Sequence, residues 1–304
     1  MIVLAAPGQG SQTPGFLAPW LEVDGVREHL ERLSDAAEVD LIRHGTLSDE
    51  ATIKDTQIAQ PLIVAASVVT AALITSGRTA RVGAVAGHSV GEFAAAAISG
   101  ILSDTEALRL VGVRGRAMAA EAAKIQTGMA AVLGGELADL LPVLAERGLF
   151  AANMNGAGQV VIAGTQDAIA EFAATPPAGL RVIPLAVAGA FHTSYMEGAV
   201  DVLRQAAATS DVHDPAIAIY TNRDGSRVES GASYRDLMVG QVSNPVRWDL
   251  CMESFATDGV TGLIELNPAG ALVGLARRAL KGTPTVAIKT PDDLQAAIDL
   301  LEAS

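Results

Sequence analysis

The feature that most restricts the possible fold is a strand, a tight turn and a helix between residues 82 and 98. An apolar run at 82–86 leads into Gly87-His88-Ser89-Val90-Gly91, and an alanine-rich segment ending at Ile98 follows. In this order a G-x-S-x-G turn lifts a serine above the edge of a sheet, where it can act as a nucleophile. The glycines let strand and helix converge, and the helix start directs free N–H groups at the serine. The alternative is an ordinary Gly/Ser turn between a buried strand and a helix.

Strands and helices alternate over most of the remaining sequence. Apolar runs typical of buried strands occur at 2–6, 216–220, 262–266 and 285–288. Helical spacing of apolar residues occurs at 26–37, 61–74, 103–122, 196–208, 234–241, 247–256, 271–280 and 292–301. This alternation predicts an α/β fold with a largely parallel sheet covered by helices on both faces.

The pattern changes between residues 127 and 189. Strands are expected at 129–133, 149–153, 159–163 and 181–187, with helices at 136–147 and 167–173. The order β-α-β-β-α-β is that of a ferredoxin-like unit. We therefore predict that 127–189 forms a small ferredoxin-like subdomain, inserted into a larger domain made of 1–126 and 190–304.

Composition limits the cellular compartment and the kinds of binding partner that we expect for this chain. The net charge of −13 argues against nucleic acid, because neutralising phosphates needs a basic surface. With a single cysteine, Cys251, the chain cannot form an internal disulfide, which fits a reducing compartment. We predict that Cys251 is a core residue. The N-terminus lacks the basic flank of a signal peptide, and the longest apolar run, 62–74, is interrupted by Ser67 and Thr70 and is shorter than a bilayer span. We predict a soluble cytoplasmic protein that binds neither nucleic acid nor membrane.

A serine nucleophile needs a base, and the chain contains five histidines. We favour His192 because it follows an apolar strand and the small-residue segment Gly189-Ala190-Phe191. The others lie on a surface helix, in polar loops or directly before the serine: His29, His44, His213 and His88. The side chain of His88 is expected to leave the strand end on the side opposite Ser89. A histidine held only by loop hydrogen bonds is the other interpretation of His192.

No acidic residue between Ser89 and His192 lies at a convincing strand end. The acidic residues considered occupy positions typical of solvated helix faces: Glu106, Glu121, Asp139 and Glu171. Because the usual third member of a catalytic triad is missing, we predict a Ser–His pair whose imidazole is oriented by another group. A backbone carbonyl can fill this role, since the requirement is to fix the tautomer.

Arg114 lies on an otherwise apolar helix face. Ser103-Asp104-Thr105-Glu106 forms a capping box that starts a helix running to about residue 122. On that helix Leu110, Arg114 and Met118 follow at intervals of four and share one face. The arginine either snorkels to the surface or is kept inside to bind an anion, and composition alone favours the surface.

Three further residues carry weaker signals. Gln9, between Gly8 and Gly10 in the loop after the first strand, could lend an oxyanion donor. Asn153 and Asn155 lie between two strands of the inserted segment, where asparagine usually serves a turn.

Several separated motifs occur together in one order. They are Pro7-Gly8-Gln9-Gly10-Ser11-Gln12, the GHSVGE run at 87–92, Arg114-Gly115 with Met118, Asn153-x-Asn155 before the strand at 158–164, Gly189-Ala190-Phe191-His192, and Gln241-Val242-Ser243-Asn244-Pro245-Val246-Arg247-Trp248. On these motifs the chain resembles the malonyl-CoA:acyl-carrier-protein transacylases, the discrete enzymes of type II fatty-acid synthesis. The resemblance covers essentially the whole length, and the Ala- and Gly-rich composition is actinobacterial-like.

The resemblance implies an α/β-hydrolase-like domain with an inserted ferredoxin-like subdomain. It implies Ser89 as the acylated nucleophile and His192 as the general base and acid. The remaining roles also follow from the resemblance: Gln9 and Val90 as oxyanion-hole N–H donors, Arg114 for the malonyl carboxylate, Met118 and Phe191 in the acyl pocket, Asn153 and Asn155 near the thioester and pantetheine arm, and the Gln241 carbonyl to orient His192.

The resemblance also implies the substrate and partners. These are malonyl-CoA, with no bound cofactor or metal, and an acidic acyl carrier protein that meets a monomeric enzyme. Because the chain itself is acidic, the carrier needs a local basic patch, and the candidates are Arg181, Arg277, Arg278 and Lys281. A ping-pong reaction through malonyl-Ser89 would serve fatty-acid or polyketide synthesis. Two alternatives stay open: a serine hydrolase or thioesterase that releases the acyl group to water, and an inactive docking module of a synthase.

Overall fold

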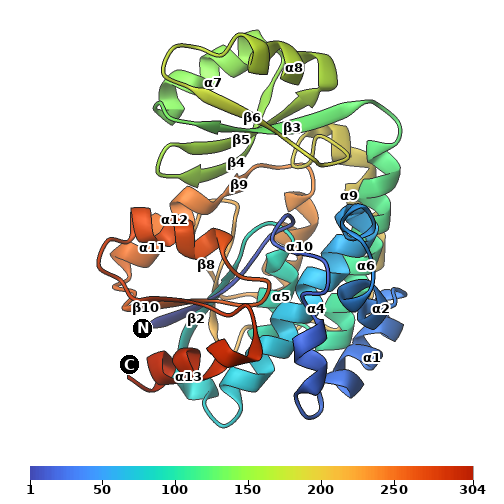
Figure 1. Ribbon diagram of the computed structural model, residues 1–304, viewed down its shortest axis with the longest axis vertical. Helices are drawn as coiled ribbons and strands as arrows, with labels where there is room; N and C mark the ends of the chain where they lie inside the picture. The colour runs from blue at the N-terminus through green and yellow to red at the C-terminus, as the bar shows by residue number, and fades with distance from the viewer. Residues whose placement is uncertain (304) are drawn as a thin grey trace.

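Two β-sheets organise the chain in the computed structural model, which describes residues 1–303 (Figure 1). The larger sheet has six strands in the order β11-β10-β1-β2-β7-β8. Their bounds are β1 Ile2–Ala6, β2 Val82–Gly87, β7 Ala218–Tyr220, β8 Arg227–Val228, β10 Gly262–Glu265 and β11 Thr285–Ala287. All neighbours pair in parallel except β7 and β8. The prediction of a largely parallel sheet is confirmed.

The central strand β1 shows why both faces of this sheet are covered. All five of its residues are buried. Ile2 and Leu4 point into one hydrophobic core and Val3 and Ala5 into the other, as the two-residue period of a strand requires. A strand that is buried on both faces needs apolar residues at consecutive positions, and all five residues of β1 are apolar.

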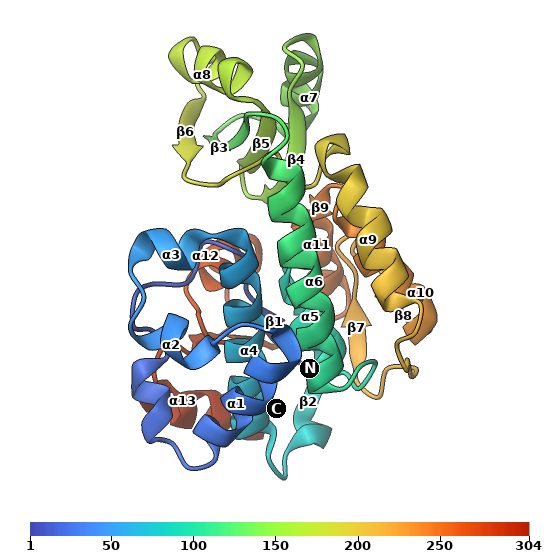
Figure 2. The ribbon, with the colours of Figure 1, turned by 90° about the vertical axis from the view of Figure 1, so that its right-hand side faces the viewer.

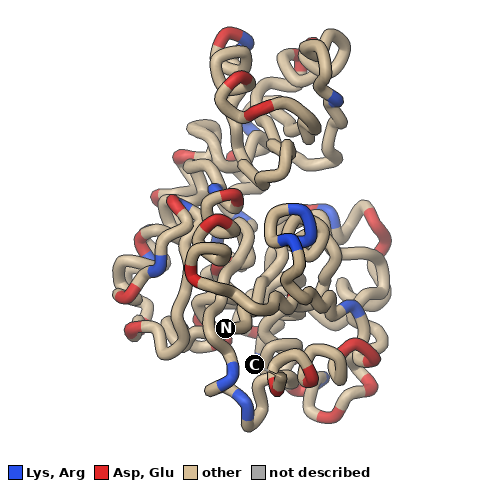
Figure 3. Tube along the Cα trace, turned by 90° about the vertical axis from the view of Figure 1, so that its left-hand side faces the viewer, with Lys and Arg blue, Asp and Glu red and all other residues tan. Residues whose placement is uncertain are grey.

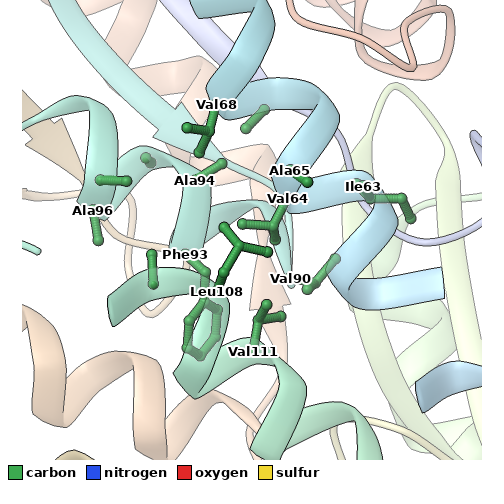
Figure 4. Close-up of a cluster of buried hydrophobic side chains, with 14 of the residues drawn as sticks. Ile63, Val64, Ala65, Val68, Val90, Phe93, Ala94, Ala96, Leu108 and Val111 are labelled. Carbon is green, nitrogen blue, oxygen red and sulfur yellow. The ribbon is translucent and has the colours of Figure 1, made fainter. Parts of the chain in front are cut away.

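Helices from the N-terminal part of the chain, together with three later ones, cover one face. The helices are α1 Val26–Ala37, α2 Leu41–Thr46, α3 Glu50–Lys54, α4 Thr56–Thr75, α5 Gly91–Ile98 and α6 Asp104–Ala122, followed later by α9 Glu197–Ala207, α10 Gly231–Gln241 and α13 Leu294–Glu302. The other face carries α11 Trp248–Thr257 and α12 Ala271–Ala279, with Cys251 buried as expected. Figure 4 shows how α4, α5 and α6 meet: Val64, Phe93 and Leu108 lie together in the first core.

Helix α4 is longer than the apolar run suggested. With 20 residues it is the one helix among residues 1–303 that is long and apolar enough to cross a membrane. The fold buries 78% of its most apolar 18-residue window, so the helix is covered by protein on most of its surface. The expectation that this segment falls short of a span is wrong in length, because the helix starts at Thr56, ahead of Pro61.

The smaller sheet has the order β6-β3-β5-β4-β9 (Figure 1). Its strands are β3 Thr127–Leu133, β4 Phe150–Gly156, β5 Gln159–Thr165, β6 Arg181–Leu185 and β9 Val246–Arg247, and its helices are α7 Leu137–Glu146 and α8 Gln166–Ala174. The four strands β3 to β6 are antiparallel, in the order expected of a ferredoxin-like unit. The two-residue strand β9 was not expected: it belongs to the larger part of the chain and pairs in parallel with β4.

Helix α6 connects the two parts. Ser103 caps it as predicted, with its Oγ accepting the Glu106 N–H at 3.1 Å. The helix packs against α4, α1 and α9, and its C-terminal end leads directly into β3 (Figure 2). The chain therefore has an α/β-hydrolase-like core with a ferredoxin-like subdomain above it.

Candidate active site

A cavity of about 430 Å³ opens between the two sheets, at the carboxyl ends of β1 and β2. Nine of the ten residues singled out from the sequence line it: Gln9, Ser89, Val90, Arg114, Met118, Asn153, Asn155, Phe191 and His192. The tenth, Gln241, lies behind this wall and contacts three of the others. Segments far apart in the sequence thus bring their candidate residues to one place.

The turn at Ser89 is a sharp elbow. Ser89 has a φ of +53°, a left-handed conformation that costs free energy for a residue with a side chain. Only glycine fits on either side of it. A Cβ at Gly87 would lie 2.0 Å from the Gly91 carbonyl carbon, and a Cβ at Gly91 would lie 2.3 Å from the Ala6 oxygen. The two glycines let β1, β2 and α5 approach closely enough to hold the strained serine in place.

Ser89 and His192 form a hydrogen-bonded pair. The Ser89 Oγ lies 2.7 Å from His192 Nε2, and His192 Nδ1 lies 2.8 Å from the backbone oxygen of Gln241. A carbonyl can only accept, so Nδ1 carries the proton and Nε2 is free to accept the serine proton. His192 also adopts a left-handed φ, +62°. This is the chemistry of a serine activated by a neutral imidazole, steadied by the main chain rather than by an acid.

Burial keeps that imidazole neutral. His192 is 4% exposed, and burial, with the positive charge of Arg114 as a second cause, lowers its pKa to about 3. The base form is therefore available throughout the neutral pH range.

The backbone donors around the serine differ in their partners. The N–H of Ser89 donates to Asn222 Oδ1 at 2.7 Å, so it is occupied. The N–H groups of Val90 and Gln9 donate to no acceptor among the described residues. Two unpaired N–H groups at a cavity wall beside a nucleophile are what an oxyanion requires.

Arg114 lies inside the protein, so the surface position favoured from composition is wrong. The side chain is 1% exposed, Nη2 donates to Gln241 Oε1 at 3.1 Å, and Nε has no hydrogen-bond partner. Its guanidinium carbon lies 5.8 Å from the centre of the Phe93 ring. Burial lowers the pKa of Arg114 only to about 10, so the group stays charged at neutral pH. A buried cation with an unused donor, facing a cavity, has the chemistry to bind an anion.

His88 and the two asparagines also lie at the cavity. His88 is among its lining residues, its Nε2 lies 2.8 Å from Asn155 Oδ1, and its ring packs edge-on against Trp248. Asn153 and Asn155 lie within β4 rather than in a turn, and both are buried at the cavity wall.

Three residues in or beside the site were missed from the sequence. Gln60 lines the cavity from α4, with its Oε1 unpaired. Glu92 and Asn222 are buried behind Ser89 and hydrogen-bond to each other. The available signals were a lone acid in the apolar segment 91–98, and a polar residue two positions after β7, at the same sheet edge as Ser89.

Basic residues gather near the cavity mouth. Arg278 lines the cavity, and Arg277 and Lys281 are exposed at the end of the same helix, α12. Figure 3 shows Lys and Arg positions together on this face, just below the smaller sheet. Among residues 1–303, no group of three or more His, Cys, Asp or Glu side chains is arranged to hold a metal ion.

Comparison with known proteins gives one consistent result. A family described as "Acyl transferase domain" matches residues 5–292. A protein from Mycobacterium tuberculosis named malonyl CoA-acyl carrier protein transacylase is 45% identical over 305 residues, covering 99% of this chain and 100% of its own length. The protein of the same name from Escherichia coli is 33% identical over 302 residues, covering 97% of each chain.

Solved structures agree with the sequence relatives. The crystal structure of MCAT from Mycobacterium tuberculosis matches with a TM-score of 0.95 and 45% identity, covering 98% of this chain and 99% of its own. A malonyl-transacylase in complex with its type II PKS acyl-carrier protein matches with a TM-score of 0.93 and 29% identity, covering 98% and 99%.

Proposed function

The chain belongs to the acyl transferase domain family and, within it, to the malonyl-CoA:acyl-carrier-protein transacylases, and we propose that it moves malonyl groups through Ser89. It takes malonyl from CoA and passes it to the phosphopantetheine thiol of an acyl carrier protein. The observation that carries the assignment of residues is the single cavity in which a Ser89–His192 pair faces the buried Arg114 cation. Neither an inactive docking module nor an ordinary esterase needs all three.

In the first half-reaction the Ser89 Oγ attacks the thioester carbonyl carbon of malonyl-CoA. The serine proton moves to His192 Nε2, and the N–H groups of Val90 and Gln9 stabilise the oxyanion. The C–S bond then breaks, and the CoA sulfur leaves with the proton held by His192. In the second half-reaction the carrier thiol gives its proton to His192, and its sulfur attacks the malonyl ester. The bond to Ser89 Oγ then breaks, and the Oγ takes the proton back from His192.

Arg114 selects the acyl group. Its buried guanidinium has an unused donor, and a malonyl carboxylate would satisfy it with a bidentate pair. An acetyl group would leave the cation without a carboxylate partner. A buried polar group that loses its partner discriminates between substrates more strongly than a difference in apolar size does. Met118 and Phe191 form the apolar wall of the acyl pocket, and Asn153 and Asn155 face the thioester and pantetheine arm.

The competition between a thiol and water tests the transfer. The malonyl-loaded enzyme, freed of CoA, is mixed with a carrier protein that bears its phosphopantetheine, and malonyl-carrier and free malonate are both measured by mass spectrometry. We expect malonyl-carrier to form much faster than malonate, because a thiol is intrinsically a far stronger nucleophile than water. Malonate as the main product, with or without carrier, would identify a hydrolase instead.

We further propose that the carrier docks on the basic group Arg277, Arg278 and Lys281. All three side chains are exposed and none forms an ion pair among the described residues. Arg181 does not join them. It lies at the far end of β6 from Leu185, which lines the cavity.

The double variant Arg277→Glu/Lys281→Glu is expected to raise KM for the carrier about 10-fold, and more than KM for malonyl-CoA, since it places like charges opposite an acidic partner. The control is Arg181→Glu, which makes the charge change of one of these two substitutions away from the cavity mouth. Steady-state transfer rates at several carrier concentrations give both KM values. Equal effects of the two variants would place the docking surface elsewhere.

The remaining assignments complete the proposal. We assign catalysis to 1–126 with 190–304 and assign 127–189 to the subdomain that closes the cavity from above. We expect a cytoplasmic monomer that needs no bound cofactor and contacts neither nucleic acid nor membrane. The carrier belongs to fatty-acid or polyketide synthesis.

A further inference from the structure

A buried carboxylate that the proposed reaction does not use lies one helical turn beyond the nucleophile. Glu92, on α5, is 1% exposed. One of its oxygens accepts the backbone N–H of Asn222 at 2.6 Å, and the other accepts the side-chain amide of Gln241. Neither Ser89 nor His192 hydrogen-bonds to the carboxylate itself. Burying a carboxylate is costly, so a structure that keeps one there needs a reason for it.

Gln241 connects Glu92 to three residues of the active site. Its Nε2 also donates to the Ser89 backbone oxygen at 3.0 Å, and its Oε1 accepts from Arg114 at 3.1 Å. Its own backbone oxygen accepts from His192 at 2.8 Å. Only this orientation of the amide pairs every donor with an acceptor. A flipped amide would turn its NH₂ against the guanidinium and its oxygen against the carboxylate.

Asn222 is the second link. Its N–H is held by Glu92, its Oδ1 accepts the Ser89 N–H at 2.7 Å, and its Nδ2 donates to the Gly87 oxygen at 2.7 Å. The side chain therefore holds the backbone at Gly87 and at Ser89 itself. Contacts of this kind help fix the left-handed serine, whose conformation the chain would not adopt unaided.

We propose that Glu92 is a positioning residue for malonyl transfer, which acts through Gln241 and Asn222 to hold the serine elbow, the histidine and the arginine in one arrangement. The inference rests on the proposed roles of Ser89, His192 and Arg114. It adds a carboxylate to a site in which the serine–histidine pair otherwise lacks one. The carboxylate does not orient the imidazole itself but the amide residue whose carbonyl does so.

A second cavity gives protons a route to Glu92. It has a volume of about 530 Å³, is lined by Glu92 and Gln241, and shares no lining residue with the substrate cavity. Burial raises the pKa of Glu92 to about 7, against the opposing effect of its hydrogen bonds and of Arg114. A protonated Glu92 would need an acceptor where Gln241 offers a donor, so the Gln241 amide would flip and Arg114 would lose its partner.

The titratable groups that face Glu92 come from three helices and from the lining of the second cavity. Among the elements packed against α5, the segments β1, β2 and α4 contain no titratable side chain. The facing groups are Arg114 on α6, Tyr234 and Asp236 on α10, Cys251 on α11, and Arg223 and Arg247 beside the second cavity. Burial raises the pKa of Tyr234 and of Cys251 away from neutrality, and burial lowers that of His192 to about 3.

The test is the rate of single-turnover acylation by malonyl-CoA and by acetyl-CoA, followed by intact mass from pH 6 to 8.5. In the wild type, malonyl loading should rise with pH through about 7 as Glu92 ionises. Glu92→Gln mimics the protonated acid. It should load malonyl about 10- to 100-fold more slowly at pH 8, lose about 10-fold of its malonyl-to-acetyl preference and show no rise near pH 7.

Two comparisons separate positioning from general damage. Glu106→Gln removes a carboxylate that pairs with Arg109, about two helical turns before Arg114, and should keep wild-type loading and pH dependence. Gln241→Met keeps the backbone carbonyl but removes the amide, so it should slow loading in the same way, and adding Glu92→Gln should cost little more. This second variant also carries the test if Glu92→Gln does not fold.

The outcomes are distinct. A wild type that does not load malonyl would overturn the proposed function itself. A wild type that loads, beside a folded Glu92→Gln with unchanged rate, preference and pH profile, would overturn only the role of Glu92. Additive losses in the double variant would do the same, because they would mean that Glu92 and Gln241 act independently.

Discussion

Ser89→Ala should form no covalent adduct with malonyl-CoA, where the wild type gains the mass of one malonyl group. The Oγ that would carry the group is removed, while the elbow, held by Gly87, Gly91 and Asn222, stays in place. Turnover should fall by at least about 10³-fold, since removing the nucleophile of a serine triad costs about 10⁶-fold.

The control is a serine outside the cavity. Ser99, which is buried at the end of α5, donates its Oγ hydrogen to the Ala96 oxygen at 3.1 Å. Ser99→Ala should load malonyl like the wild type. His192→Ala should load slowly rather than not at all, since it removes the base but keeps the nucleophile. A full malonyl adduct on Ser89→Ala would mean that another residue is acylated and would end the assignment.

Local patterns predicted the fold well because the forces behind them are local. The Ser103 cap, the apolar run of β1 and the β-α-β-β-α-β order depend on neighbours within a few residues, and the structure contains all three. The two-residue strand β9 has no such local signal. It forms only because β4 offers an edge beside it.

The site was harder to predict because its contacts join distant segments. Composition placed Arg114 at the surface, since residue type says nothing of a partner 127 positions away. Glu92 was overlooked because acids were sought at strand ends, whereas its partners Asn222 and Gln241 come from much later in the chain. In each case the deciding contact is not encoded in local spacing.

Arg114→Ala should convert a malonyl-selective enzyme into one that scarcely distinguishes malonyl from acetyl. The malonyl carboxylate would lose a charge-assisted bidentate pair in a buried site, where such a pair contributes most. We expect kcat/KM for malonyl-CoA to fall about 10²- to 10³-fold, equivalent to about 3–4 kcal/mol. Acetyl loading should change little or rise, because acetyl no longer has to leave a buried cation unpaired.

Substitutions at two arginines distinguish bidentate binding of the carboxylate from a simple effect of positive charge. Arg114→Lys keeps the charge but cannot form the bidentate pair, so its malonyl preference should fall between that of the wild type and that of the alanine variant. Arg116→Ala removes a partly exposed arginine two positions on, which pairs with Glu38, and should keep the wild-type ratio. The measurement is competitive loading from equal malonyl-CoA and acetyl-CoA, read as the ratio of the two adducts.

Stability should not account for the loss in Arg114→Ala. The variant loses a contact with Phe93 and one hydrogen bond to Gln241, but it is also relieved of a buried, incompletely paired cation. The two effects oppose each other, so the thermal midpoint should move far less than the malonyl rate. An unchanged malonyl-to-acetyl ratio in a folded Arg114→Ala would show that the cavity selects its acyl group by shape, and Arg114 would then be a structural cation.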